Sequence, residues 1–229
     1  MICIQICSKR EWRSLKEILN INQDLISFTP YGEYTSKSIA GKECIFYHSG
    51  ITKTKSTGAC QYAIGNWKPQ YIFVLGTCGG VLETLKPLDI VIANKTVQYD
   101  CIIGGDKKSP IFFEDLIEEI DNSWINFERL SLKIFEGLIA TADQSLRTEQ
   151  IDMLCNENVL CADWESGAIS HICKLNKTKC CILRGITDIP RRDDINSDIN
   201  QGIDYKINTP LVMEKLLNTL LPEILQQLY

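Results

Sequence analysis

The sequence predicts a single α/β domain in which a largely parallel or mixed β-sheet is covered by helices on both faces. Uniformly apolar runs such as 71–75 and 180–184 are typical of strands that are buried on both sides. These runs alternate along the chain with segments of helical periodicity. The 229 residues are 45% hydrophobic and 23% charged, which is a globular composition with enough chain for a substantial core.

Strands are expected where apolar and β-branched residues run together between turn residues. In chain order these runs are 1–7, 25–28, 34–39, 43–47, 71–75, 89–93, 138–141 and 180–184. Helices are expected where apolar residues recur with a period near 3.6. These segments are 9–20, 52–67, 164–175 and roughly 209–227. Residues 100–123 give no clear pattern, and 191–206 is interpreted as a polar segment that leads into the last helix.

The charge pattern excludes several classes of protein. Twenty-four basic and 29 acidic residues give a net charge of −5 without any basic run, so we expect no nucleic-acid partner. No apolar stretch approaches the roughly 18 residues of a membrane span, so no membrane partner is expected. In the N-terminal sequence the charges follow the short apolar stretch, which is unlike a signal peptide, and a cytoplasmic location is expected.

The eleven cysteines and two histidines indicate no metal site and no cofactor. No pair has C-x-x-C spacing, and His48 and His171 lie far apart in the sequence. Five cysteines lie within runs of Ile, Phe or Leu, and we expect them to be reduced core residues: Cys3, Cys7, Cys44, Cys180 and Cys181. Nothing marks one thiol as a nucleophile paired with a histidine.

Ligands of such sheets bind beyond the carboxyl ends of the strands, which directs attention to the residues after Ile6, Leu75 and Ile186. The glycine-rich sequence 76–80 would let backbone N–H groups approach a ligand, although alone it is better interpreted as a tight turn. Asp188 is either a helix N-cap or a proton donor. Glu11 is most simply a solvated residue of a first helical turn.

The segment 162–168 places two acids at the start of an apolar helix. Asp163 and Glu165 suit the positive end of the helix dipole. Trp164 and Glu165 are followed by three small residues, which indicates a helix N-terminus that packs closely against a flat group.

Taken together, six motifs resemble the nucleoside phosphorylase/nucleosidase family, and within it the methylthioadenosine/S-adenosylhomocysteine nucleosidases. In order, the motifs are His48–Lys53, Gly76–Gly80, Asp89–Val91, Ala140–Asp143, Asp163–Ile169 and Arg184–Asp188. The resemblance extends from the first strand to about Asp188. It implies one nucleoside phosphorylase-like domain over 1–229, with a central mixed, partly closed sheet flanked by helices. It also implies a homo-oligomer, commonly a dimer.

The resemblance implies roles for three carboxyl groups in cleaving a purine nucleoside to release adenine. Asp188 corresponds to the acid that protonates the base at N7, and Glu165 to the carboxylate that holds the ribose hydroxyls. Glu11 is the counterpart of the acid that activates water. The further residues implied in substrate binding are Trp164, Thr77, Cys78, Gly79, Ser145, Leu146, Asp163 and Arg184.

The sequence departs from the family pattern in three places, and the departures at Trp164 and Ser145 concern the substrate more than the reaction. The match of Glu11 needs a one-residue gap, because the usual Gly-Ala-Met-x-x-Glu is here Cys7–Glu11. Trp164 replaces the Met that usually precedes the ribose-binding Glu. Ser145, beside Leu146, replaces the aromatic residue that commonly stacks on the purine. Stacking is then expected from Trp164 or from a residue in 98–113.

The nucleophile is expected to be water. A phosphate co-substrate needs cationic or N–H donors. The position of the phosphate-binding Arg of the family's hexameric phosphorylases falls at Val74, and no Lys or Arg lies between Pro69 and Leu85. Arg10, Arg13 or a neighbouring subunit could supply the charge instead. A phosphorylase therefore stays open as an alternative, as does a nucleoside-binding protein without catalytic activity.

Overall fold

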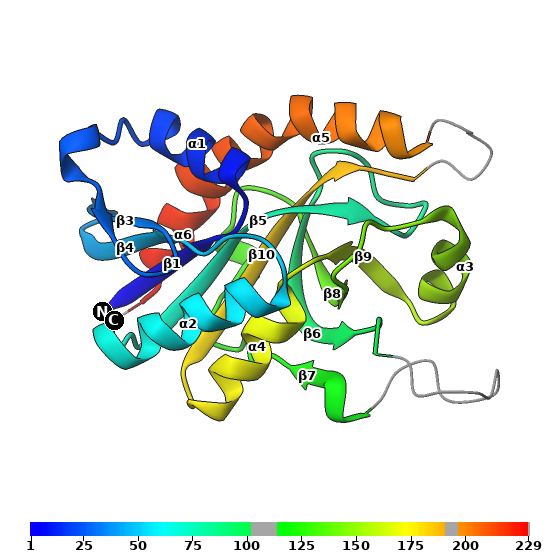
Figure 1. Ribbon diagram of the computed structural model, residues 1–229, viewed down its shortest axis with the longest axis horizontal. Helices are drawn as coiled ribbons and strands as arrows, with labels where there is room; N and C mark the ends of the chain where they lie inside the picture. Colours follow the sequence, from blue (N-terminus) through cyan, green and yellow to red (C-terminus); the bar gives the residue numbers. More distant parts are fainter. Residues whose placement is uncertain (102–113, 191–196, 229) are drawn as a thin grey trace.

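One mixed β-sheet, with helices on both faces, organises the computed structural model, which describes residues 1–101, 114–190 and 197–228 (Figure 1). The predicted α/β class is confirmed. The strands are β1 Ile2–Ile6, β2 Ser27–Phe28, β3 Glu33–Ile39, β4 Lys42–His48, β5 Tyr71–Gly80, β6 Ile90–Gln98, β7 Ile117–Glu119, β8 Ile134–Thr141, β9 Val159–Asp163 and β10 Lys179–Asp188. The helices are α1 Lys9–Ile18, α2 Lys53–Trp67, α3 Thr148–Asn156, α4 Ser166–Leu175, α5 Ser197–Glu214 and α6 Leu221–Leu225.

Part of the sheet closes on itself. β10 pairs with β6, β6 with β8, β8 with β9, β9 with β5, and β5 again with β10, so these strands form a ring. From β5 the sheet continues through β1, β4, β3 and β2. The pairs β1–β5, β10–β5 and β8–β9 are parallel, whereas β10–β6 and β5–β9 are antiparallel. This is the mixed, partly closed sheet that the resemblance implied.

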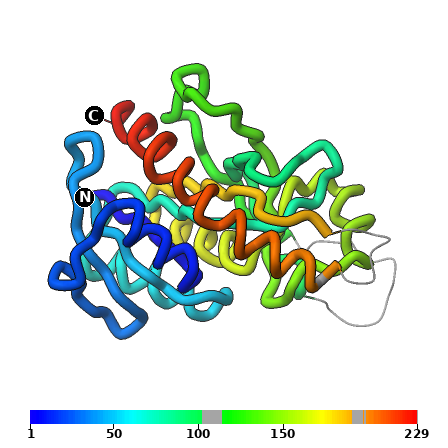
Figure 2. The backbone as a smooth tube through the Cα atoms, turned by 90° about the horizontal axis from the view of Figure 1, so that it is seen from above, coloured from blue at the N-terminus to red at the C-terminus, as the bar shows by residue number. Residues whose placement is uncertain are grey.

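The side chains of β1 alternate between the two faces of the sheet, because successive residues of a strand point in opposite directions. Ile4 and Ile6 belong to a cluster with α1, α5 and α6. Cys3 joins a second cluster with α2 and α4. In Figure 1 α1 and α5 lie above the sheet and α2 and α4 below it, and Figure 2 shows the C-terminal helices running beside α1.

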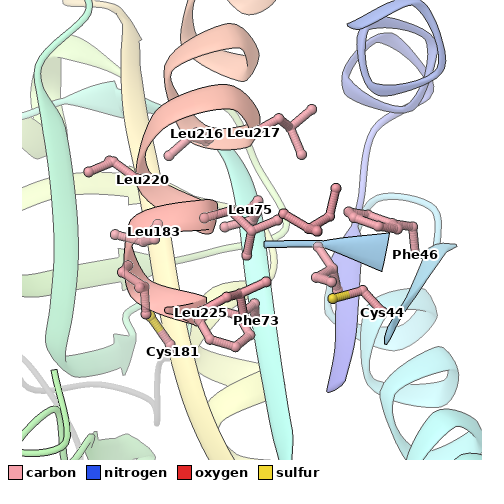
Figure 3. Packing of buried hydrophobic residues seen from close by; sticks show 14 of the residues in the cluster. Cys44, Phe46, Phe73, Leu75, Cys181, Leu183, Leu216, Leu217, Leu220 and Leu225 are labelled. Carbon is pink, nitrogen blue, oxygen red and sulfur yellow. The ribbon is translucent and has the colours of Figure 1, made fainter. Parts of the chain in front are cut away.

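The C-terminal helical region fills the core on one face of the sheet (Figure 3). Leu216, Leu217 and Leu220 lie in the π-helical stretch Lys215–Leu220 and face β5 and β10. Each is at most 1% exposed. Fully burying one such side chain contributes about 1.5–3 kcal/mol, so this stretch anchors the helix that closes one side of the site.

The eleven cysteines are free thiols, and the five that were predicted to be core residues are buried. Of the other six cysteines, Cys101 is exposed, Cys155 is half-buried and four are buried. Desolvation raises the pKa of the Cys3 thiol to about 12, so that it stays a neutral, inert packing group.

The glycine-rich sequence after Leu75 is not the expected turn but the second half of β5. Position 76 has room only for glycine, because a Cβ there would lie 2.4 Å from Nη1 of Arg184 and 2.6 Å from Oε1 of Glu11. Pairing with β10 continues to Gly79, and Gly79 and Gly80 pair with β9. The strand predicted at 180–184 likewise continues to Asp188, so the predicted helix N-cap reading of Asp188 is wrong.

The last helical segment begins at Ser197, before the predicted start at 209. Its early apolar residues are Ile199, Ile203, Ile207 and Leu211, which are 46–64% exposed. These four side chains face away from the core. The first half of the helix therefore lacks the buried apolar face by which an amphipathic helix is predicted. The remaining residues of the expected polar segment, 191–196, lie outside the described residues. The sequence interpretation also missed β7, α3 and β9.

Across the described ranges, no helix combines the length and hydropathy needed to cross a membrane.

Candidate active site

A cavity of about 420 Å³ opens where β5, β9 and β10 end. The end of β5 contributes Thr77, the junction of β9 and α4 contributes Glu165, and the end of β10 contributes Asp188. The beginning of α1, the first half of α5 and residues 51, 145 and 146 complete the wall. Because the strands that contribute these residues are neighbours in the closed ring, distant parts of the sequence meet at one place.

The residues predicted for the site line this cavity, with one exception. The lining residues among them are Asp188, Glu11, Glu165, Trp164, Thr77, Cys78, Gly79, Ser145, Leu146 and Asp163. Arg184 is fully buried and is not among the lining residues. Its place behind the wall points to a positioning role instead of direct contact with a ligand.

Glu11 is buried in the first turn of α1, so the expected solvated position is wrong. Its Oε1 accepts hydrogen bonds from the backbone N of Thr77 at 2.7 Å and from Oγ1 of Thr77 at 2.8 Å. Its Oε2 accepts from the backbone N of Ser8 at 2.8 Å, and Ser8 Oγ in turn accepts from the backbone N of Glu11. A carboxylate offers about four acceptor sites, so roughly one stays available for a ligand or a water.

Glu165 lies at the N-cap of α4 and is 5% exposed. Burial raises the pKa of its carboxyl, whereas the Arg184 guanidinium opposes that rise. The distance from Nη2 of Arg184 to Oε2 of Glu165 is 3.3 Å, and the backbone N of Thr52 donates to Oε1 at 3.4 Å. Both contacts are long, so the carboxylate keeps acceptor capacity toward the cavity.

Asp163 organises the start of α4 and holds Arg184. Its Oδ1 accepts from the backbone N of Ser166 at 3.1 Å and from Oγ1 of Thr141 at 2.7 Å. Its Oδ2 accepts from Nε of Arg184 at 2.7 Å. The guanidinium thus joins Asp163 and Glu165, and both carboxylates face the cavity with their positions set from behind.

Asp188 ends β10 with its carboxyl largely buried. Burial raises the pKa of this carboxyl to about 6, although the hydroxyl of Thr187, which donates to Oδ1 at 2.6 Å, opposes the rise. A Cβ at Gly79 would lie 3.3 Å from Oδ2, so the absence of a side chain there leaves that oxygen accessible. A buried acid with a raised pKa and one accessible oxygen is suited to proton donation.

Replacing Arg184 with Met is expected to lower the free energy of unfolding by about 3–5 kcal/mol, because two buried carboxylates lose their cation. Urea unfolding at pH 8 measures this loss. At pH 5 the loss is expected to be smaller, since without the cation the carboxyl pKa values rise and protonation relieves the repulsion.

The matched control for Arg184 is Lys16→Met, which breaks the half-exposed pair of Lys16 with Glu33. A pair of that kind contributes about 1 kcal/mol or less. Equal losses in the two variants would contradict the proposed role of Arg184.

Further cavity residues were not predicted from the sequence: Ser8, Ile51, Ala162, Thr187, Gln201, Gly202 and Tyr205. Several of these residues belong to motifs that were already noted. They lie within a few positions of Glu11, Glu165 or Asp188 in the sequence, and this closeness could have marked them as cavity residues. The three from α5 carried no such signal, because their helix was not recognised.

Purine stacking was expected from Trp164 or from a residue in 98–113, and the structure places these candidates differently. Trp164 lines the cavity, with its side chain half-buried. Tyr99 packs into a hydrophobic cluster with Leu146 and does not line the cavity. Residues 102–113 lie outside the described residues.

None of the described residues that line the cavity is Lys, Arg or His. Arg10 lies 5.9 Å from the ring centre of Tyr205, and Arg13 is exposed. His171 pairs with Glu118 at 2.6 Å, away from the cavity. Within the described residues, no group of His, Cys, Asp and Glu side chains has the arrangement of a metal site.

Comparison with known proteins identifies the family. The sequence profile of the Phosphorylase superfamily matches residues 8–216, which is most of the chain. The chain belongs to this family. Among its relatives, a 5'-methylthioadenosine/S-adenosylhomocysteine nucleosidase of Buchnera aphidicola is 27% identical to this chain over 221 residues, and the match covers 90% of each chain. An aminodeoxyfutalosine nucleosidase of Helicobacter pylori is 27% identical over 175 residues, with 72% of each chain covered.

A solved structure of another family member has the same fold. The 5'-methylthioadenosine/S-adenosylhomocysteine nucleosidase of Helicobacter pylori superposes with a TM-score of 0.79 at 21% identity, covering 98% of this chain and 97% of that one. The expected family and fold are therefore confirmed. The names of these relatives also agree with the expected type of enzyme, an N-glycosidic hydrolase.

Proposed function

We propose that this member of the phosphorylase superfamily hydrolyses the N-ribosidic bond of a purine nucleoside, such as 5'-methylthioadenosine or S-adenosylhomocysteine, and releases adenine. One observation carries the proposal. Asp188, Glu165 and Glu11 come from three separate elements, and all three line one cavity that is large enough for a small organic molecule.

The reaction needs three carboxyl groups with different tasks. The bond between C1′ and N9 breaks, and its electron pair passes into the purine while positive charge develops on the sugar. Asp188 gives its proton to N7 of the departing base, and Glu165 accepts hydrogen bonds from the ribose hydroxyls, which strengthen as the sugar becomes cationic. Glu11 takes a proton from the water that adds to C1′, so the products are adenine and a free sugar that keeps the 5′ substituent of the substrate.

The other lining residues suit a flat, nearly neutral base. Trp164 and Leu146 provide apolar surface, and Cys78 and Gly79 border the base beside Asp188. Ser145 is exposed at the same edge of the cavity. In this assignment Trp164 takes the place of the family's usual aromatic residue.

Water is the nucleophile in this proposal because the described lining of the cavity offers no basic side chain for a phosphate. Arg184 is committed to Asp163 and Glu165. The expected homodimer, cytoplasmic location and lack of a cofactor stay predictions.

A base-release assay with adenosine, 5'-methylthioadenosine and S-adenosylhomocysteine, run with and without inorganic phosphate, tests the proposal. Adenine and free sugar are expected without phosphate. Release only with phosphate, yielding the sugar 1-phosphate, would establish a phosphorylase instead. Binding without release of base from any of the three nucleosides would establish a nucleoside-binding protein.

A further inference from the structure

One end of the cavity is lined by hydrogen-bonding side chains that the proposed reaction does not use. Ser8 precedes α1, while Gln201 and Tyr205 lie one helical turn apart on α5. All three are half-buried and line the cavity together with Ile51. We call Ser8, Gln201 and Tyr205 the polar end of the cavity.

The polar end has a defined donor and acceptor. The hydroxyl of Tyr205 donates to Ser8 Oγ at 2.9 Å, and Ser8 Oγ also accepts from the backbone N of Glu11 at 3.1 Å. Within the described part of the chain, the Ser8 hydroxyl proton has no acceptor, and the Tyr205 oxygen receives no proton. The two oxygens therefore offer a ligand one donor and one acceptor, 2.9 Å apart.

The position of Tyr205 is supported from several sides. The Arg10 guanidinium lies 5.9 Å from the centre of its ring. Three residues further along α5, Asn208 donates to the backbone oxygen of Thr187 at 2.7 Å, which ties this part of the helix to the end of β10. This contact fixes the part of α5 that carries Tyr205 beside the strand end that carries Asp188.

The orientation of a bound nucleoside follows from the proposed roles. With the base at Asp188 and the ribose between Glu165 and Glu11, the 5′ substituent points away from the base, toward the wall formed by α1 and α5. A 5′-hydroxyl can accept from Ser8 and donate to Tyr205. A methylthio sulfur is a weak acceptor without a proton, so it would leave both groups without a hydrogen-bonding partner.

We infer that the polar end is a specificity subsite that selects purine nucleosides with a hydroxyl group at the 5′ position over those with a 5′-methylthio group. This inference rests on the proposed function: it keeps the hydrolysis of a purine nucleoside but makes adenosine, instead of the 5′-thioether nucleosides named above, the preferred substrate. A pocket that is built to hydrogen-bond a substrate hydroxyl discriminates strongly against analogues that lack it. Gln201 adds an amide that can donate to or accept from the same group.

The test compares kcat/KM for adenosine, 5′-deoxyadenosine and 5'-methylthioadenosine in the wild type and in Tyr205→Phe. We expect the wild type to prefer adenosine over both analogues by roughly tenfold or more. Tyr205→Phe is expected to reduce that preference about tenfold, mainly through a lower kcat/KM for adenosine. General damage to the helix would lower all three values together and leave their ratio unchanged.

Tyr31→Phe is the matched control, because Tyr31 is 42% exposed and does not line the cavity. Its preference among the three nucleosides is expected to equal that of the wild type. A wild-type enzyme that cleaves 5'-methylthioadenosine as well as or better than adenosine would overturn the inference, as would an unchanged preference in Tyr205→Phe.

Failure of the proposed function has a different signature, because no nucleoside would then release its base. In that case the same nucleosides are titrated calorimetrically into the wild type and Tyr205→Phe. Tighter binding of adenosine than of 5'-methylthioadenosine, lost in Tyr205→Phe, would support the subsite. Equal affinities would overturn it.

Discussion

Asp188→Asn is expected to lower kcat/KM for base release about 10²–10⁴-fold, which is the usual contribution of a general acid. Asparagine keeps the shape of the side chain and can still donate a hydrogen bond, but it cannot transfer a proton to N7. Most of the loss should appear in kcat, because the ground-state contacts with the base are largely retained. Steady-state adenine release measures both constants.

Asp24→Asn is the matched control for this variant, because Asp24 is exposed in a short 3₁₀ turn outside the cavity. Its activity is expected to stay at the wild-type level. An Asp188→Asn variant that retained most of its activity would remove Asp188 from the proposed mechanism.

The raised pKa of Asp188 also predicts how kcat/KM depends on pH. Burial raises this pKa to about 6, so the carboxyl carries its proton below about pH 6 and loses it above. The wild-type kcat/KM should therefore fall as pH rises through about 6, and the residual activity of Asp188→Asn should lack that decline. Because the folded-state pKa is raised, ionisation of Asp188 destabilises the folded protein as pH rises through this range. Asp188→Asn should then be at least as stable as the wild type at pH 8.

Glu11→Gln is expected to lower kcat about 10²–10⁴-fold, since an amide cannot take a proton from water. The geometry adds a second effect. Three donors already point at the two oxygens of Glu11, namely the backbone N of Ser8 and both donor groups of Thr77. A glutamine must turn its NH₂ toward one of them, which leaves a buried donor unpaired and lowers the free energy of unfolding by about 1–3 kcal/mol.

Glu17→Gln provides a control with the same substitution on the same helix, because Glu17 is exposed. It should change neither kcat nor stability by a measurable amount. Adenine binding should survive in Glu11→Gln, which calorimetry can verify. If kcat were unchanged in Glu11→Gln, another group would have to activate the water.

The core strands were predictable because burial on both faces leaves an unmistakable apolar run. The runs 71–75 and 180–184 are of this kind, and they form the parts of β5 and β10 that lie under α5 and α6. Their continuation through Gly76–Gly80 and Gly185–Asp188 was not predictable, because small and polar residues there carry no strand signal. The register between β10 and β5 holds those residues in the sheet.

Helix α5 and the role of Arg184 depended on contacts between distant segments. The apolar stripe of α5 faces outward, so local periodicity could not reveal which side of the helix lines the cavity. Arg184 lies four residues before Asp188 in the same motif, and in a regular strand this spacing would place both side chains on one face. The register of β10 shifts between Ile186 and Asp188, and the Arg184 side chain pairs with Asp163 and Glu165 behind the cavity wall. Neither fact follows from residue type.

The order of residues along the chain was enough to predict an α/β fold, because apolar strands are local signals. Glu11, Glu165 and Asp188 were assigned their roles through the motif resemblance, since each of them alone also had an ordinary structural interpretation. The mixed, partly closed sheet and the family came from the motif resemblance. The remaining properties of the site depend on the tertiary structure. Closure of the ring of strands collects the three carboxyls around one cavity, burial raises the pKa of Asp188, and α5 adds the polar end around Tyr205. Those properties arise from distances between segments far apart in the sequence, and such distances exist only once the sheet has closed.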